Sequence, residues 1–216
     1  MSERSLIHWC VVMTRARPLP PAERRASLIA ATRQLILDHG PEVTTRQVAE
    51  AAKVAEGTLF RVFPTRRDLI AATIADHLSP ERLADIFAAA PTTTTVDETT
   101  EVCLSTAADY VTTFGRFIPR PHRGGDHQDE IRFRIMELWE ARVCDIAGWM
   151  RDRLAPHETQ LTIPVKDFAH LVITLAMGYA HGRSPDTSLN PATLARLALD
   201  ELRQADPVHF AEVDRR

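Results

Sequence analysis

The sequence TTRQVAEAAKVAEGTLFRVFPTRRDLI, residues 44–70, decides the fold of this chain. Apolar residues recur in it at helical spacing, and a short break at residues 53–55 separates two short helical patterns. The second pattern, residues 56–63, ends at Pro64, and Thr65 lies where the N-cap of another helix is expected. The stretch therefore predicts two short helices joined by a tight turn, with a further helix directly after them.

A longer helical pattern precedes this stretch. Pro20 and Pro21 open it, and Gly40 followed by Pro41 closes it, as expected for these residues at helix ends. Thr45 lies where the N-cap of the next helix is expected. Three short helices around a small apolar core, with a tight turn between the second and the third, form a helix-turn-helix. In that motif the second helix of the pair enters the DNA major groove.

The remaining sequence is also helical in pattern, and no stretch shows the sustained alternation of a β-strand. Polar or glycine-containing sequence at residues 91–100 and 119–127 predicts loops. The expected fold class is all-α, with a three-helix DNA-binding domain and a larger helical domain. Further helices are expected at residues 79–90, 101–118, 129–154, 164–181 and 191–202.

The chain is expected to divide into three parts. Residues 1–20 are predicted to be a disordered tail, residues 21–75 the DNA-binding domain, here called the head, and residues 76–216 the larger helical domain, here called the body. Residues 1–70 carry 11 Lys and Arg against 7 Asp and Glu, whereas residues 71–216 carry 15 against 22. A basic front and an acidic back indicate different partners for the two parts.

The composition is that of a soluble globular protein, with 44% hydrophobic and 25% charged residues and a net charge of −3. No apolar run approaches the roughly 20 residues that a membrane span needs. The three cysteines are widely spaced and form no CxxC motif. This pattern argues against a disulfide framework or a zinc finger and favours a reducing, cytoplasmic compartment.

Small and basic side chains occur together in the second short helix of the motif and just after it. Gly57 and Thr58 have too little bulk to prevent a close approach, and Arg61 lies one helical turn after Thr58 on the same face. Arg66, in the first turn of the next helix, can reach a phosphate. Close contact with a phosphate backbone explains both the small residues and the basic cluster.

The stretch resembles the DNA-binding motif of the TetR family of bacterial transcriptional repressors over residues 24–75, with the spacing of the family pattern matched throughout. The matching residues are Thr45, Arg46, Val48, Ala49, Ala52, Val54, Gly57, Thr58, Phe63 and Leu69. The DNA-contacting residues expected on this basis are Thr45, Arg46, Gln47, Glu56, Gly57, Thr58, Phe60, Arg61 and Arg66.

Four positions depart from the family pattern. Lys53 stands where a turn glycine is usual, and a left-handed backbone there would cost a lysine about 1 kcal/mol. Ala55 replaces a serine, which leaves the recognition helix without a side-chain N-cap. Phe60 replaces a tyrosine whose hydroxyl bonds a phosphate, and Arg66 replaces a lysine and keeps its charge.

The resemblance implies a ligand-responsive repressor that binds a palindromic DNA operator as a homodimer and is released by a small molecule, with no cofactor and no membrane partner. Dimerisation is expected through the helices at residues 164–181 and 191–202. The first contains LVITLAMGYA, which is apolar nearly all round, and the second carries an apolar stripe. The body is thus expected to be a ligand-binding and dimerisation domain.

Aromatic, polar and soft side chains on the inner faces of the body helices are the candidates for the ligand site, although such residues also fill cores. The candidates are Thr106, Asp109, Tyr110, Thr113, Phe114, Phe117, Met136, Trp139, Arg142 and Met177. Arg142 falls within an apolar stripe, and Asp109 is expected on the apolar side of its own helix. The two are therefore either paired with each other or polar groups of the pocket, unless Arg142 extends to solvent.

Two other classes of function are compatible with an all-helical chain. An all-helical enzyme is disfavoured because the chain has no nucleophile elbow, P-loop, dinucleotide-binding glycine pattern or metal signature. His170 and His181 share a helix face but lack the spacing of metal ligands, so core or interface positions are expected for them. The remaining alternative is a helical ligand-binding or protein-interaction module whose DNA-binding head has degenerated, because of the departures at residues 53, 55 and 60.

Overall fold

The computed structural model describes residues 20–118, 127–182 and 189–203, so the predicted tail at residues 1–20 lies almost wholly outside the described residues. These residues form helices and no β-strand, which confirms the all-α class. The helices are α1 (Pro21–His39), α2 (Thr45–Ala51), α3 (Glu56–Val62), α4 (Arg66–His77), α5 (Pro80–Ala89), α6 (Val96–Gly115), α7 (His127–Leu154), η1 (Ala155–Gln160), α8 (Val165–His181) and α9 (Pro191–Asp200).

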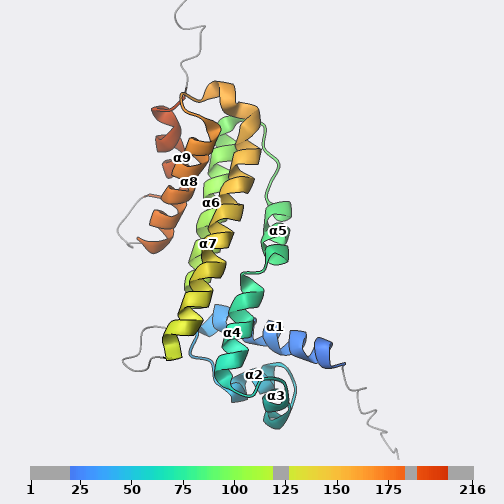
Figure 1. Ribbon diagram of the computed structural model, residues 1–216. Coiled ribbons are helices and arrows are strands. Elements are labelled where there is room, and N and C mark those ends of the chain that lie inside the picture. Colours follow the sequence, from blue (N-terminus) through green and yellow to red (C-terminus); the bar gives the residue numbers. More distant parts are fainter. Residues whose placement is uncertain (1–19, 119–126, 183–188, 204–216) are drawn as a thin grey trace, which may run out of the picture.

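The helices of the head lie at one end of the molecule, and the long helices α6 and α7 run side by side away from it (Figure 1). Helix α4 leaves the head and reaches the body, where α5 packs beside α7. Helices α8 and α9 cover another side of α6 near the far end (Figure 1). The head and the body are thus joined through α4 and through the hydrogen bond from Arg116, just after α6, to Leu37 of α1.

Local signals in the sequence account for the helix ends of the head. Gly40 ends α1 with a φ of 83°, a left-handed conformation that favours glycine. The N-cap of α2 is Thr44, not Thr45 as predicted, because Gln47 three residues later completes a capping box with Thr44. Thr65 caps α4 in the same way with Asp68, as the sequence predicted for this threonine.

The head has its own small apolar core. Leu28 and Ile36 of α1, Leu59 of α3 and Leu69 of α4 are all almost fully buried, together with Phe63. The guanidinium of Arg25 lies 4.5 Å from the centre of the Phe63 ring and covers its outer side. The burial of Leu59 and Phe63 fixes which face of α3 points outward.

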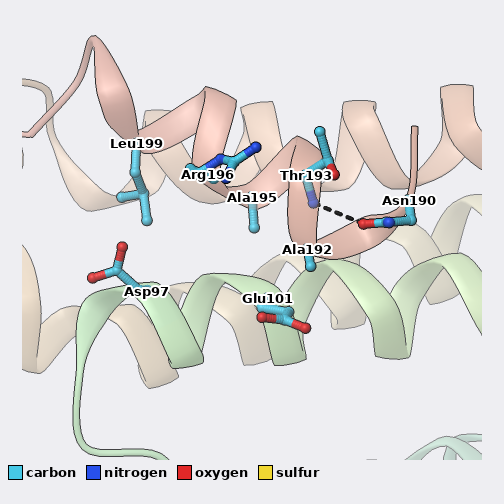
Figure 2. Close-up of a pocket in the computed structure, with 8 residues that line it drawn as sticks. All are labelled: Asp97, Glu101, Asn190, Ala192, Thr193, Ala195, Arg196 and Leu199. Atoms are coloured by element: carbon cyan, nitrogen blue, oxygen red, sulfur yellow. Dashed lines mark hydrogen bonds between the residues drawn. The ribbon is translucent and has the colours of Figure 1, made fainter. Parts of the chain in front are cut away.

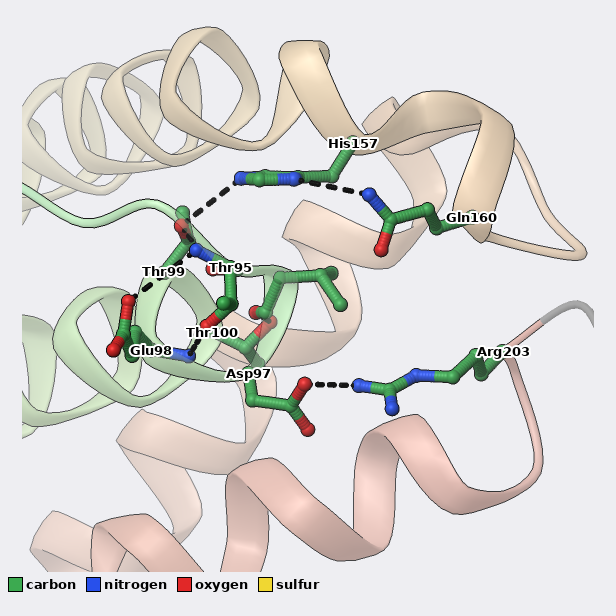
Figure 3. Close-up of polar contacts among 9 residues, drawn as sticks. Thr95, Asp97, Glu98, Thr99, Thr100, His157, Gln160 and Arg203 are labelled. Carbon is green, nitrogen blue, oxygen red and sulfur yellow. Dashed lines mark hydrogen bonds and ion pairs between the residues drawn. The ribbon is translucent and has the colours of Figure 1, made fainter. Parts of the chain in front are cut away.

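Helix α6 begins at Val96, five residues before the predicted start, so the second half of the predicted loop at residues 91–100 is helical. Thr95 and Glu98 form a capping box, and hydrogen bonds from Thr94 and Thr95 lower the pKa of the exposed Glu98 carboxyl (Figure 3). Inside the helix, the hydroxyl of Thr99 donates to Thr95 O and that of Thr100 to Val96 O, each at 2.7 Å. Threonines that suggest a loop by composition are thus used here as a cap and as helix-bonded side chains.

The 3-10 helix η1 was not predicted and closes the far end of the body. His157 is buried there, with Nε2 3.2 Å from Thr99 Oγ1 and Nδ1 3.4 Å from Gln160 Nε2 (Figure 3). Asp97, near the start of α6, pairs with Arg203 just beyond α9 (Figure 3). These contacts connect the start of α6 to η1 and to the segment just beyond α9.

Helix α8 is buried on one side only, although its sequence is apolar nearly all round. One side, which includes Phe168 and Val172, is buried against α6 and α7. The opposite side is exposed along its length, with His170, Thr174, Gly178 and His181 on it. The two histidines therefore share a face, as predicted, but are not core residues in the single chain. Among the described residues, no helix is both long and apolar enough to cross a membrane.

Lys53 provides a test of how the turn between α2 and α3 is built. Its φ is 54°, the left-handed conformation in which a side chain is strained. Replacing Lys53 by Gly is expected to raise the free energy of unfolding by up to about 1 kcal/mol, measured by urea denaturation. Lys53→Ala, which removes the charge but keeps the strain, should leave it almost unchanged. Equal stability of the Gly and Ala variants would contradict this interpretation.

Candidate nucleic-acid interface

Helix α3 is held as the recognition helix of the motif by its inner side and by the turn before it. Leu59 has no exposed surface, and the backbone N–H of Val54 donates to Ala49 O at 2.9 Å across the turn. Ala55, the N-cap of α3, gives no side-chain hydrogen bond, as the sequence predicted. The first N–H groups of α3 therefore have no side-chain acceptor at the N-cap, and this end of a helix attracts phosphate.

The outer face of α3 presents small, aromatic and basic groups to solvent. Gly57 and Arg61 are exposed, Thr58 is half-buried, and Phe60 is 44% exposed. A Cβ built on Gly57 would meet no atom within 4 Å, so packing within the protein does not require glycine there. Arg46 of α2 is also exposed. This combination permits a close approach of α3 to a groove with arginines at its sides.

Thr45, Gln47 and Glu56, three of the predicted DNA-contacting residues, already have partners within the head. The hydroxyl of Thr45 donates to Glu56 Oε1 at 2.5 Å and joins the start of α2 to the start of α3. Gln47 Oε1 accepts from the backbone N–H of Thr44 at 2.8 Å. These bonds set the angle and position of α3, so a substitution at any of these residues would change both the shape of the head and its contacts.

Arg66 has a structural part that the sequence did not indicate. Its Nε donates to Val43 O at 2.7 Å and its Nη2 to Pro41 O at 2.8 Å, so it closes the loop between α1 and α2. The sequence could not show this, because the two carbonyl groups are 23 and 25 residues away in the chain. Arg67, the next residue, is exposed. It joins Arg46 and Arg61 as a candidate phosphate contact.

Gly57→Ala separates the needs of the fold from the needs of DNA binding. Since the added methyl meets open space, the free energy of unfolding should be unchanged or rise by up to about 1 kcal/mol. Operator affinity, measured by fluorescence anisotropy, should fall by at least about 10-fold, because the methyl occupies the closest point of approach.

Gly115→Ala is the matched control, because its Cβ would also meet no atom within 4 Å and it lies at the end of α6. This variant should bind the operator as tightly as the unchanged chain. An unaltered affinity of Gly57→Ala would remove Gly57 from the interface.

A stack of nearly parallel rings fills the junction between the head and the body. The His77 ring, at the end of α4, lies 4.3 Å from Phe117 and 5.5 Å from Tyr110, measured between ring centres. Trp139 of α7 lies 4.4 Å from Phe114 and 6.1 Å from Tyr110. The ring planes of these four pairs are within 19° of parallel. We call these five residues the ring cluster.

The structure brings some of the predicted ligand-site residues together and separates others. Tyr110, Phe114, Phe117 and Trp139 are buried in the ring cluster, and Thr106, Thr113 and Met177 are half-buried. Met136 is 46% exposed, so it does not line this interior. Asp109 is exposed, and its predicted place on the apolar side of α6 is wrong. The apolar side passes through its neighbours Ala108 and Tyr110, which turns Asp109 to solvent.

Arg142 is buried, but its carboxylate partner is not Asp109. Arg142 is only 8% exposed, and its Nη2 lies 3.0 Å from Asp145 Oδ2, one turn further along α7. Its Nε and Nη1 are buried with no hydrogen-bond acceptor. The hydroxyl of Tyr110 is also buried without a partner, and burial raises the pKa of Tyr110 to about 12 even though the Arg142 charge acts to lower it. This hydroxyl therefore remains a neutral donor.

Sequence reasoning missed His77, which the structure places against the rings of Tyr110 and Phe114 in α6 and of Phe117 just after it. Burial, with smaller effects of the Arg82 and Arg33 charges, lowers the pKa of His77 to about 4, against an opposing effect of Asp76. His77 is therefore neutral near pH 7, and its Nε2 is buried with no partner. Its place at the last turn of α4 could be read from the sequence, but its burial depends on α6 and could not.

Stability should depend on pH through His77. The unfolded chain takes up a proton near the ordinary pKa of 6.5, whereas the folded chain does so only near 4. Stability is therefore complete above about pH 6.5 and falls as the pH is lowered toward about 4, by up to about 3 kcal/mol. The free energy of unfolding, measured with urea at several pH values in this range, should change less steeply with pH in His77→Phe, which keeps a ring in the stack. The same slope in both proteins would show that His77 is not the group responsible.

Two hollows occur elsewhere on the described surface. One, of about 350 Å³, lies between α6 and α9 at the end of α6 opposite the head, where Asp97 and Glu101 face α9 (Figure 2). The other, of about 510 Å³, lies between the end of α1 and the end of α6 and includes Arg116. Arg116 Nη1 donates to Leu37 O of α1 and so bridges head and body. Among the described residues, no cluster of three His, Cys, Asp or Glu side chains could hold a metal ion.

One family model matches the head of this chain. Residues 28–73 match the family model described as bacterial regulatory proteins, tetR family. This segment contains all of α2 and α3 and most of α1 and α4. No curated protein sequence matches the chain.

Solved structures share the fold at low sequence identity. A Rhodococcus sp. RHA1 protein described as a transcriptional regulator is 19% identical over 83% of this chain and 95% of its own, with a TM-score of 0.56. The superantigen PfiT is 14% identical over 87% of this chain and 100% of its own, with a TM-score of 0.55. Salmonella enterica GusR is 17% identical over 84% of this chain and 98% of its own, with a TM-score of 0.50. At these identities the solved structures show a shared fold, and the family match lies in the head alone.

Proposed function

We propose that this chain, a DNA-binding transcriptional regulator of the TetR family, is a repressor that binds a palindromic operator as a homodimer and is released by a small molecule. The observation that carries the proposal is the outer face of α3. It combines a glycine with open space above it, an exposed aromatic ring and the exposed Arg61 on a helix fixed from behind by Leu59. We place the protein in the cytoplasm, where its operator would lie.

The proposed dimer brings two copies of α8 and α9 together. Leu197 on α9 is 53% exposed, although its neighbours Ala198 and Leu199 are buried in the same chain. On α8 the exposed side carries Gly178, which leaves room for the backbone of a second helix to approach. A helix-turn-helix dimer places its two recognition helices one helical turn of DNA apart, which requires a palindromic operator.

The ligand response is proposed to act through the end of α4. His77 lies against the rings of Tyr110 and Phe114 in α6, and Arg82 holds Asp76 at 2.7 Å immediately before His77. A molecule that enters the ring cluster would displace these groups and with them the helix that carries the head. DNA and ligand then favour different positions of α4, and each weakens the binding of the other by the same factor.

The direct test is selection of bound duplexes from a random DNA pool by the purified protein, followed by sequencing. A palindromic motif is expected. Its affinity should fall by about 10³-fold or more between about 50 and 200 mM salt if six or more phosphates are neutralised. No motif at low salt would overturn the proposal and favour the alternative, an interaction module with a degenerate head.

Leu197→Glu tests the proposed interface. A carboxylate there would be buried against its copy in the dimer, so light scattering should give the mass of a monomer, and operator affinity should fall by at least about 100-fold. Leu138→Glu on α7 is the matched control, because Leu138 is 37% exposed but lies outside α8 and α9. This control should remain dimeric. A dimeric Leu197→Glu variant would place the interface elsewhere.

A further inference from the structure

We propose that the effector is an organic anion, a carboxylate on a flat apolar body, bound between α6 and α7 by Arg142 and Tyr110. The inference rests on the proposed ligand response and assigns the chemical class of the ligand. It starts from polar atoms that the folded chain leaves without partners in one buried place. These are Nε and Nη1 of Arg142, the hydroxyl of Tyr110 and Nε2 of His77.

The unpartnered groups of Arg142 are costly for a protein that gains nothing from them. A buried guanidinium loses its hydration, and here a single carboxylate, that of Asp145, accepts from Nη2 alone. An apolar side chain of similar length at this position would avoid that loss and would generally be at least as stable. An acceptor supplied by a ligand accounts for the arginine, because a carboxylate has two oxygens with which to meet its N–H groups.

The hydrogen-bonding character of the cluster favours an anion over a cation. Arg142 is positive, and the Tyr110 hydroxyl stays protonated and can donate. Arg33 and Arg82 add positive charge near His77, with Asp76 as the acid that acts on it there. A cationic ligand would meet these charges, and no Asp or Glu among the described residues is buried to accept it.

Asp145 marks the route by which the anion would arrive. Its side chain is 50% exposed, whereas that of Arg142 is 10% exposed, so the pair lies where the cluster meets solvent. A carboxylate from solvent can take the place of Asp145 and then use the N–H groups that Asp145 leaves unoccupied. Asp145 is thus an internal competitor whose removal should tighten binding.

The ring cluster determines the shape of the apolar part. Tyr110 and Trp139 are separated by 6.1 Å between centres with planes 8° apart, and His77 and Phe114 by 6.5 Å with planes 2° apart. Neither hollow described above reaches these rings, so a ligand must insert among them. A flat molecule inserts parallel to the planes with the least displacement, and the displacement it causes moves His77 at the end of α4.

Binding is tested on the full-length protein without DNA, so that a failure of operator binding cannot affect the result. The probes are benzoate, 2-naphthoate and octanoate, each compared with its own neutral amide at about 5 mM, enough to fill most sites with a Kd of about 1 mM. The measurements are the shift in Tm and calorimetric titration. We expect at least one flat carboxylate to raise Tm while its amide does not.

Variants then assign the contact. Arg142→Met should bind the active carboxylate at least about 10-fold more weakly, with the Tm of the unliganded protein unchanged or raised. Tyr110→Phe, which keeps the ring, should weaken binding about 3–10-fold, and Asp145→Asn should tighten it. Arg151→Met is the matched control, since Arg151 is an exposed arginine of α7 that pairs with Asp152 at 2.9 Å, and it should bind as the unchanged chain does.

Three results would overturn the inference. They are equal binding of acid and amide, undiminished binding of the carboxylate by Arg142→Met, and no binding of any of the three acids. A lower Tm of unliganded Arg142→Met would also count against the inference, because Arg142 would then stabilise the fold. If carboxylates bind as expected but the selected DNA pool yields no motif, the ligand class stands and the proposed repressor function fails.

Discussion

A recognition helix of seven residues cannot hold itself in shape, and the rest of the head depends on this constraint. Isolated helices shorter than about 12–15 residues are marginal in water, and α3 lacks a side-chain N-cap as well. Contacts with the rest of the head therefore fix the position of α3. Leu59 and Phe63 anchor its inner side, the bond between Thr45 and Glu56 fixes its start, and Arg66 holds the loop that supports α2. The face left over is the one that can meet DNA.

Because α3 depends on contacts from outside the helix, the sequence predicted the location of the head well but the roles of single residues less well. Helix ends marked by Pro21, Gly40 and Thr65 follow from local rules, and the structure agrees with them. The roles of Thr45 and Arg66 involve partners 11 to 25 residues away, which no local pattern reveals. Thr44 could have been recognised as the N-cap, since Gln47 completes its box three residues later.

In the body, patterns predicted helices better than they predicted side-chain surroundings. Threonine-rich composition suggested a loop at residues 91–100, although Thr95 and Glu98 carry the signal of a helix start. The unusual position of Arg142 was visible in the sequence, but its partner Asp145 and the exposure of Asp109 required the structure. His77 gains its importance only where α4 meets α6. The ring cluster thus connects the head and the body. The sequence identified most of its aromatic residues but could not show that they stack.

The central claim is that two copies of the chain present their α3 helices to one DNA site at a fixed separation. The most direct measurement is the distance between spin labels at Glu50, an exposed residue of α2, in the operator complex, with the native cysteines replaced by alanine. The account predicts a narrow distribution of distances at about 30–40 Å, near one helical turn of DNA. The absence of dipolar coupling between the two spin labels, or a broad distance distribution that DNA does not narrow, would contradict it.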